Sequence, residues 1–114
     1  MSQFNPLSIP HIESQKHSAD NEFGEEIIAQ IQRFERTLAG KFDVGVHIPG
    51  HLFFTLTAVK KWHSLPLMCF YGITEGEPIA IYQHQNQVNF SLVRSPIAQP
   101  NQPRKPIGFT TEGE

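Results

Sequence analysis

Hydrogen-bonding side chains are concentrated at residues 83–90, which read QHQNQVNF. The amides there can donate and accept at the edge of a nucleobase or a ribose, and the imidazole of His84 can do either according to its tautomer. His84, Gln87 and Asn89 are therefore candidate ligand-binding residues. The alternative is an ordinary polar turn, because Asn and Gln are common where a chain reverses direction in solvent.

Flat and cationic side chains accompany this polar segment. Tyr82 and Phe90 offer surfaces on which a base can stack. Arg94, Arg104 and Lys105 are cations in a chain of net charge −2, and a guanidinium matches the oxygens of a phosphate in a bidentate manner. The set suits a nucleotide, although Arg104 and Lys105 would equally keep a C-terminal loop soluble.

The usual catalytic arrangements are incomplete. His47 and His51 flank a Pro-Gly turn, but a zinc site needs a third protein ligand, so we expect no metal. Cys69 lies in an apolar run, where a buried and unreactive thiol is expected. No Gly-x-Ser-x-Gly or Walker-type segment occurs, and Glu75 and Glu77 lie in a predicted turn. The sequence thus predicts a protein that is not an enzyme and has no cofactor.

Composition narrows the range of partners. A chain of 114 residues with a pI near 6.3 is expected to form one domain without general affinity for DNA, RNA or anionic membranes. Its one cysteine cannot form an intrachain disulfide. We find no signal peptide and no long apolar span, so we expect a cytoplasmic protein.

The N-terminal part combines an irregular segment with a strongly periodic one. Residues 1–21 contain two prolines and no apolar period, which predicts an arm that is either flexible or docked on its own body or a neighbouring subunit. From Glu22 to Ala39, apolar residues recur at helical spacing, so a domain at 22–114 should begin with an amphipathic helix. Asp20 or Asn21 would cap its first turn, and Gly40 would end it.

The remaining sequence predicts strands. Alternation at 42–48 and a Pro-Gly turn indicate a hairpin with 51–59, followed by a connection at 60–64. Further strands are expected at 65–71, 79–83, 90–93 and 107–110. The fold class is therefore α+β, with one N-terminal amphipathic helix packed on a small antiparallel sheet of about five or six strands.

Several motifs from residue 34 to residue 109 resemble an uncharacterised family of small phage and prophage proteins. These motifs are a Phe-Glu-x-x-Leu helix end, a Val-Gly pair, a Trp before a Phe-x-Gly strand, a Gln-His followed by Gln-x-Asn, and a closing Pro-Arg-x-Ile-Gly-Phe. The chain departs from the last motif by one inserted residue between Arg104 and Ile107. The matching positions are Phe34, Glu35, Leu38, Val44, Gly45, Trp62, Phe70, Tyr71, Gly72, Gln83, His84, Gln87, Asn89, Pro103, Arg104, Ile107, Gly108 and Phe109.

In size and layout the chain is also similar to phage sponge proteins that sequester the cyclic nucleotide signals of bacterial Thoeris and CBASS immunity. That resemblance implies a homo-oligomer in the bacterial host cytoplasm that binds a cyclic ADP-ribose isomer or a cyclic oligonucleotide without turnover. In such a site Arg104, with Arg94 behind it, would carry the charge. Asn89 and His84 would read the purine or ribose, and Tyr71 or Trp62 would stack, unless these aromatic residues serve only in packing.

Two other classes of function remain open at this point. A protein-binding anti-defence inhibitor would show a contiguous exposed apolar or single-charge patch. A small structural or assembly component of a virion would show extended arms that become ordered in a multimer. A deep polar pocket lined by Arg104 and Asn89 would favour the sponge.

Overall fold

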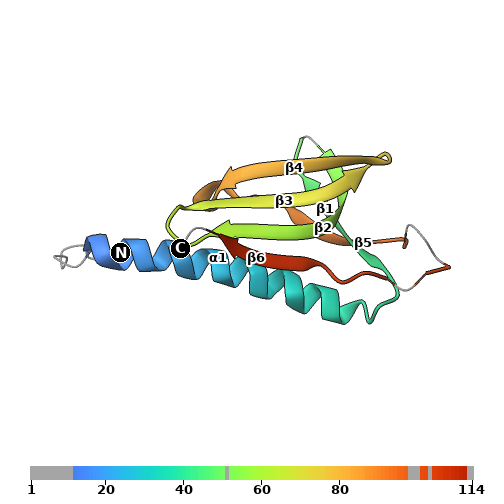
Figure 1. Ribbon diagram of the computed structural model, residues 1–114, viewed down its shortest axis with the longest axis horizontal. Helices are drawn as coiled ribbons and strands as arrows, with labels where there is room; N and C mark the ends of the chain where they lie inside the picture. The colour runs from blue at the N-terminus through green and yellow to red at the C-terminus, as the bar shows by residue number, and fades with distance from the viewer. Residues whose placement is uncertain (1–11, 51, 98–100, 103, 113–114) are drawn as a thin grey trace.

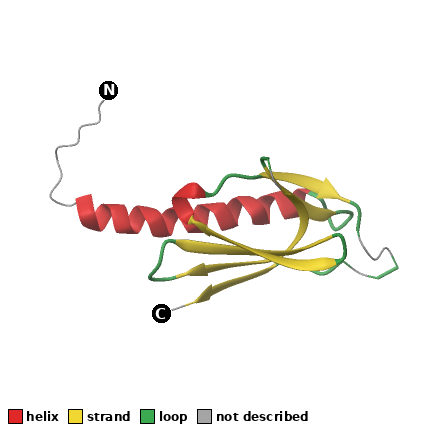
Figure 2. Ribbon diagram, turned by 90° about the horizontal axis from the view of Figure 1, so that it is seen from above, coloured by secondary structure: helices red, strands yellow, loops and turns green. Residues whose placement is uncertain are grey.

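A long helix lies along one face of a strongly twisted sheet (Figures 1 and 2). The computed structural model describes residues 12–50, 52–97, 101–102 and 104–112, with side chains from Phe23 onward. The helix, α1, spans Ile12–Thr37. The predicted start at Glu22 is therefore wrong, since Asp20 and Asn21 lie inside the helix rather than cap it. Residues 13–19 contain no Pro or Gly and include good helix formers, which allows the helix to extend. The rest of the predicted arm, 1–11, lies outside the described residues.

The apolar stripe of α1 faces the sheet, as its spacing predicted. Ile31 is fully buried, and Ile27, Phe34 and Leu38 pack against the same core. The helix ends at Thr37, close to the expected Gly40. Ala39 and Gly40 have φ angles of 52° and 74°, a left-handed conformation that does not continue a helix. No described helix has both the length and the apolar character needed to cross a membrane.

The strands form a single sheet, which confirms the α+β class. In space the order is β4-β3-β2-β1-β5, and β6 pairs with β2 off this path. All neighbouring pairs are antiparallel except β2 with β6, which is parallel, so the expectation of a purely antiparallel sheet fails at the last strand. The strands are β1 (Asp43–Ile48), β2 (Leu52–Trp62), β3 (Leu67–Thr74), β4 (Glu77–His84), β5 (Ser91–Ser95) and β6 (Gly108–Glu112).

Strand β2 is the centre of the sheet. Pairing with β1 extends to Thr55, and pairing with β6 begins at Ala58. On the β3 side the register shifts between Leu56 and Ala58, which marks a β-bulge. The sequence predicted a connection at 60–64, but β2 continues to Trp62, because β3 and β6 both hydrogen-bond to this part of the strand.

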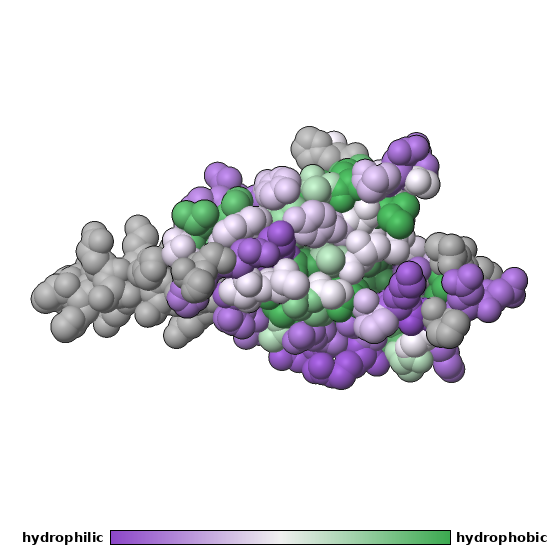
Figure 3. Space-filling model, viewed as in Figure 1, coloured by the Kyte–Doolittle hydropathy of each residue, from purple (hydrophilic) through white to green (hydrophobic). Residues whose placement is uncertain are grey.

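Among the described elements, α1 covers one face of the sheet and leaves the other face uncovered. The face toward α1 carries the core, which includes Val46, Phe54 and Phe70. On the opposite face, no described element packs over the strands, and Phe53, Ile73 and Tyr82 keep between 44% and 58% of their surface exposed. In Figure 3, pale and green side chains lie among purple ones over the strands, whereas the lower edge, where α1 lies, is largely purple. We call the uncovered side the open face.

Candidate functional site

Two aromatic rings lie close to one ammonium group on the open face, and a third ring lies next to one of them. The Nζ atom of Lys60 lies 5.6 Å from the ring centre of Trp62 and 5.9 Å from that of Tyr71. The rings of Trp62 and Tyr82 have centres 6.4 Å apart and are tilted by 44°. We call these four residues, Lys60, Trp62, Tyr71 and Tyr82, the aromatic platform. The structure thus brings together Trp62 and Tyr71, which the resemblance implied as stacking residues, and Tyr82, which the sequence also offered as a stacking surface. It adds Lys60 to them.

Strand pairing positions the platform. Lys60 and Tyr82 are both opposite Cys69, so the three residues form one row across β2, β3 and β4. Cys69 is fully buried, as expected, although it points to the open face, because its larger neighbours cover it. Hydrogen bonds with the Cys69 thiol and the Tyr82 hydroxyl raise the pKa of Tyr71 well above that of an ordinary tyrosine. The Tyr71 hydroxyl is therefore neutral at physiological pH.

A pocket of about 330 Å³ lies beside β2, between the stretch that pairs with β1 and the stretch that pairs with β6. Its volume is at the lower end of the range of small-molecule sites. We call it the bulge pocket. Its lining residues come from β1, the β2 bulge, β3 and the segment before β6: Asp43, Thr55, Leu56, Thr57, Ile73, Ile97, Gln102, Arg104, Lys105 and Pro106.

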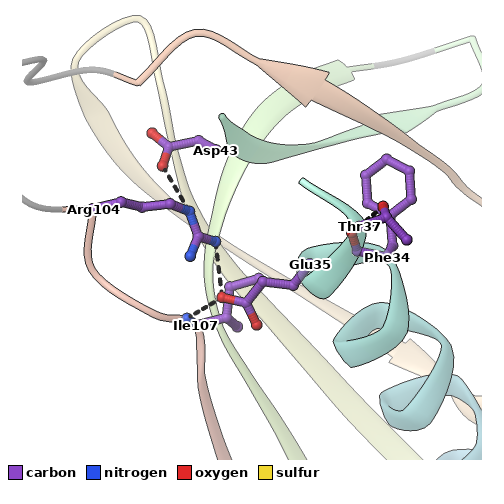
Figure 4. A network of polar contacts seen from close by, with 6 residues as sticks. All are labelled: Phe34, Glu35, Thr37, Asp43, Arg104 and Ile107. Carbon is purple, nitrogen blue, oxygen red and sulfur yellow. Dashed lines mark hydrogen bonds and ion pairs between the residues drawn. The ribbon is translucent and has the colours of Figure 1, made fainter. Parts of the chain in front are cut away.

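Arg104 lies in the wall of the bulge pocket between two carboxylates (Figure 4). Its Nη2 atom is 2.8 Å from Oε2 of Glu35 on α1, and its Nε atom is 3.4 Å from Oδ1 of Asp43 on β1. The same Glu35 oxygen accepts a hydrogen bond of 3.0 Å from the backbone N–H of Ile107. The guanidinium therefore ties the segment before β6 to both α1 and β1. The sequence proposed Arg104 as a phosphate ligand and gave no sign of these partners.

The polar segment 83–90 does not form one site. His84 ends β4 on the open face, two residues after Tyr82, and its Nδ1 atom accepts a 3.3 Å hydrogen bond from the backbone N–H of Asn86. A short 3₁₀ helix, η1 (Gln85–Gln87), follows, and Gln87 and Asn89 are exposed. His84 thus lies at the edge of the aromatic platform, whereas Gln87 and Asn89 follow on the loop toward β5.

Gln85 has a role that the sequence did not indicate. Its side chain is 1% exposed and packs so closely on α1 that a Cβ added at Gly24 would lie 2.9 Å from its Nε2 atom. Part of the dense polar stretch is thus a helix-docking turn. The small residue at position 24 within the helical pattern is the signal that could have revealed this contact.

The other candidates lie apart from the aromatic platform. Arg94 is on β5, with its guanidinium carbon 4.9 Å from the ring centre of Phe42. Lys105 is exposed at the bulge pocket. Phe90 packs edge-on against Phe70, with ring centres 5.3 Å apart, so its ring belongs to the core on the helix side.

Searches against protein-family models, curated proteins and solved structures found no match to this chain. No group of three or more His, Cys, Asp or Glu side chains in the described part of the chain could hold a metal ion. The arrangement that remains is an aromatic surface with an embedded cation, next to a pocket of mixed polarity.

Proposed function

We propose that this protein binds a nucleotide on the aromatic platform and does not convert it. The observation that carries the proposal is the position of the Lys60 ammonium, within 6 Å of the ring centres of both Trp62 and Tyr71 on an uncovered sheet face. Stacking on such rings contributes about 1–3 kcal/mol per base, and it tolerates any base because every base has a π-face. The ammonium provides the charge that a phosphate requires.

The Lys60 ammonium is available to a ligand. Its partner Glu112 is 3.6 Å away, and the Glu112 side chain is 50% exposed. An ion pair of this kind contributes between 0 and about 1 kcal/mol, so a phosphate can replace it at little cost. Arg104 is less suited, because two carboxylates already hold its guanidinium.

The chemistry of the aromatic platform supports binding without turnover. The thiol of Cys69 lies beneath the rings with no exposed surface, and the Tyr71 hydroxyl has a raised pKa, so neither is a ready nucleophile. Together with the resemblance described above, this favours a phage immune-evasion protein. Its ligand would be a cyclic nucleotide signal, such as a cyclic ADP-ribose isomer or a cyclic oligonucleotide, held by a homo-oligomer.

Thermal unfolding against a panel of cyclic nucleotides and ADP-ribose isomers tests this function. A ligand present at about a hundred times its dissociation constant should add roughly 2.7 kcal/mol, which raises the melting temperature by about 10 °C. Chromatography after heating should recover the nucleotide unchanged. An altered nucleotide would show an enzyme, and no shift with any member of the panel would refute nucleotide binding.

Matched variants test the site itself. Lys60→Ala should weaken binding about tenfold or more, because it removes both the cation and its contacts with the rings. Lys41→Ala removes an exposed lysine just after α1 and should leave the affinity unchanged. Tyr82→Phe should bind like the native protein, since the ring and not the hydroxyl forms the stacking surface. Equal loss of affinity in Lys41→Ala and Lys60→Ala would mean that only net charge matters.

A protein-binding inhibitor is the second candidate, because the same open face exposes large apolar side chains. Phe53 is 44% exposed, Ile73 is 47% exposed and Tyr82 is 58% exposed. Apolar groups gathered on one face are typical of protein-interaction surfaces. A nucleotide panel without effect, combined with loss of anti-defence activity in Phe53→Ser, would favour this function.

A further inference from the structure

We infer that the bulge pocket is a second subsite, which takes an uncharged, hydroxyl-bearing group, a ribose, from the ligand whose base lies on the aromatic platform. This inference rests on the proposed function. It assigns ligand recognition to Thr55 and Thr57, which no sequence motif indicated.

The pocket exists because β2 changes partner along one edge. Pairing with β1 ends at Thr55 and pairing with β6 begins at Ala58. Between these two stretches, the bulge interrupts the regular hydrogen bonds of β2. From there, β1 pairs with the part of β2 toward Leu52, and β6 pairs with the part toward Trp62. Bulges commonly redirect side chains next to functional sites. The hydroxyl-bearing residues Thr55 and Thr57 lie at this opening.

The charges around the pocket balance and so favour a neutral group. Arg104 and Lys105 line the pocket with two positive charges and Asp43 with one negative charge. Glu35 on α1 is not among the lining residues, but it contacts Arg104 and contributes a second negative charge. The side chains of Arg104, Glu35 and Asp43 are between 11% and 17% exposed, so their interactions are only partly screened by water. A phosphate that approached Arg104 would meet two carboxylates. A hydroxyl group meets no such repulsion.

Hydrogen-bonding capacity in the pocket suits a ribose. Thr57 donates its hydroxyl proton to the carbonyl oxygen of Tyr71 at 3.2 Å, so its own oxygen remains an acceptor for a ligand hydroxyl. Thr55 is partly buried beside it, and the amide of Gln102 can donate and accept. Apolar contacts from Ile73 and Ile97, which also line the pocket, would cover the sugar carbons.

The pocket and the aromatic platform are close enough for one nucleoside. Ile73 lines the pocket and lies two residues after Tyr71 on β3, on the same side of the sheet. Two residues of strand span about 7 Å, which is comparable to the distance from a base to the hydroxyls of its ribose. A base stacked on Tyr71 would therefore bring its ribose to the pocket opening.

The test compares adenosine 5′-monophosphate with its 2′,3′-dideoxy analogue, titrated to millimolar concentration and followed by ¹H–¹⁵N NMR. The native protein should bind the ribose form at least tenfold more tightly. The backbone amides of Thr55, Thr57 and Ile73 should shift with that form alone, and the indole N–H of Trp62 should shift with both. The double variant Thr55→Val/Thr57→Val, which keeps the side-chain shape, should bind both compounds equally. Lys41→Ala, at an exposed lysine that is not among the lining residues of the pocket, should retain the preference.

The outcomes separate this inference from the proposed function. If the Trp62 signal shifts while both compounds bind equally to the native protein, nucleotide binding stands and the ribose subsite is wrong. The same conclusion follows if the double variant, shown by its melting curve to be folded, keeps the tenfold preference. If no signal of the aromatic platform shifts with either compound, both proposals are overturned.

Discussion

Replacing Arg104 with alanine should destabilise the protein strongly. The guanidinium lies between Glu35 at 2.8 Å and Asp43 at 3.4 Å, and its side chain is 11% exposed. Without it, two mostly buried carboxylates would face each other with no cation between them. Glu35 would retain the 3.0 Å hydrogen bond from the N–H of Ile107, which compensates only part of the loss.

The magnitude follows from burial. Removing one partner of a fully buried ion pair costs about 3–5 kcal/mol. The two carboxylate side chains keep about a sixth of their surface, 16% and 17%, so solvent reduces this cost and we expect roughly 3 kcal/mol. For a domain of this size, the melting temperature should fall by roughly 10–20 °C.

Urea and thermal unfolding, followed by circular dichroism, measure this effect. The double variant Glu35→Ala/Arg104→Ala should be more stable than the sum of the single changes predicts, by about 2 kcal/mol, because the two groups contact each other directly. Arg94→Ala is the matched control. Its guanidinium lies over the ring of Phe42 and Arg94 itself is exposed, so the change should cost less than about 1 kcal/mol.

One result would refute this reasoning. If Arg104→Ala unfolds at the native temperature but no longer binds nucleotide, Arg104 is a ligand residue, as the sequence proposed, and the ion pairs contribute little. If it is destabilised and its remaining folded fraction still binds, Arg104 supports the fold. The two roles are thus distinguished by measuring stability and affinity on the same sample.

Two further predictions concern the strands. Gly72→Ala should lower the free energy of unfolding, measured in urea, by several kcal/mol, because the added Cβ would overlap the ring of Phe54. Gly108→Ala should be nearly neutral, because no atom lies closer than 4.0 Å to its added Cβ. Equal effects of the two changes would contradict this packing. In the folded protein the pKa of Tyr71 is raised, chiefly by its hydrogen bond with Cys69. As the pH rises, the Tyr71 hydroxyl therefore loses its proton near pH 10 in the unfolded chain, at a lower pH than in the folded protein. The free energy of unfolding should therefore decline as pH rises above about 10, and Tyr71→Phe should show a smaller decline in the same titration.

The sequence predicted those helices and strands whose apolar residues recur at a regular spacing within the segment itself. The spacing of Ile27, Ile31, Phe34 and Leu38 indicated the buried face of α1, and alternation indicated β1. The early start of the helix was missed because the apolar period is absent before Glu22, although helix propensity there is adequate. Periodicity detects a face that packs, so a helical extension without an apolar stripe gives no such signal.

The partners of individual polar residues were much harder to predict. Arg104 meets Glu35 and Asp43 because α1, β1 and the segment before β6 converge, and nothing near position 104 in the sequence shows this. Gln85 looked like one polar residue of a solvated stretch, yet it is buried against α1. A cation or an amide can serve a ligand or the fold, and the choice depends on long-range geometry.

The aromatic platform depends on the bulge in β2. Before it, even-numbered residues such as Phe54 and Leu56 face α1; after it, Val59 and Lys61 do so. Lys61 accordingly lies on the helix side, where its Nζ atom is 3.2 Å from Glu25. The apolar spacing of three from Leu56 to Val59 was the sequence signal for this change of face. Without the extra residue, strand alternation would turn Lys60 and Trp62 toward α1, because a shift of one residue exchanges the two faces. The same irregularity that opens the bulge pocket therefore also places the cation and the indole on the open face.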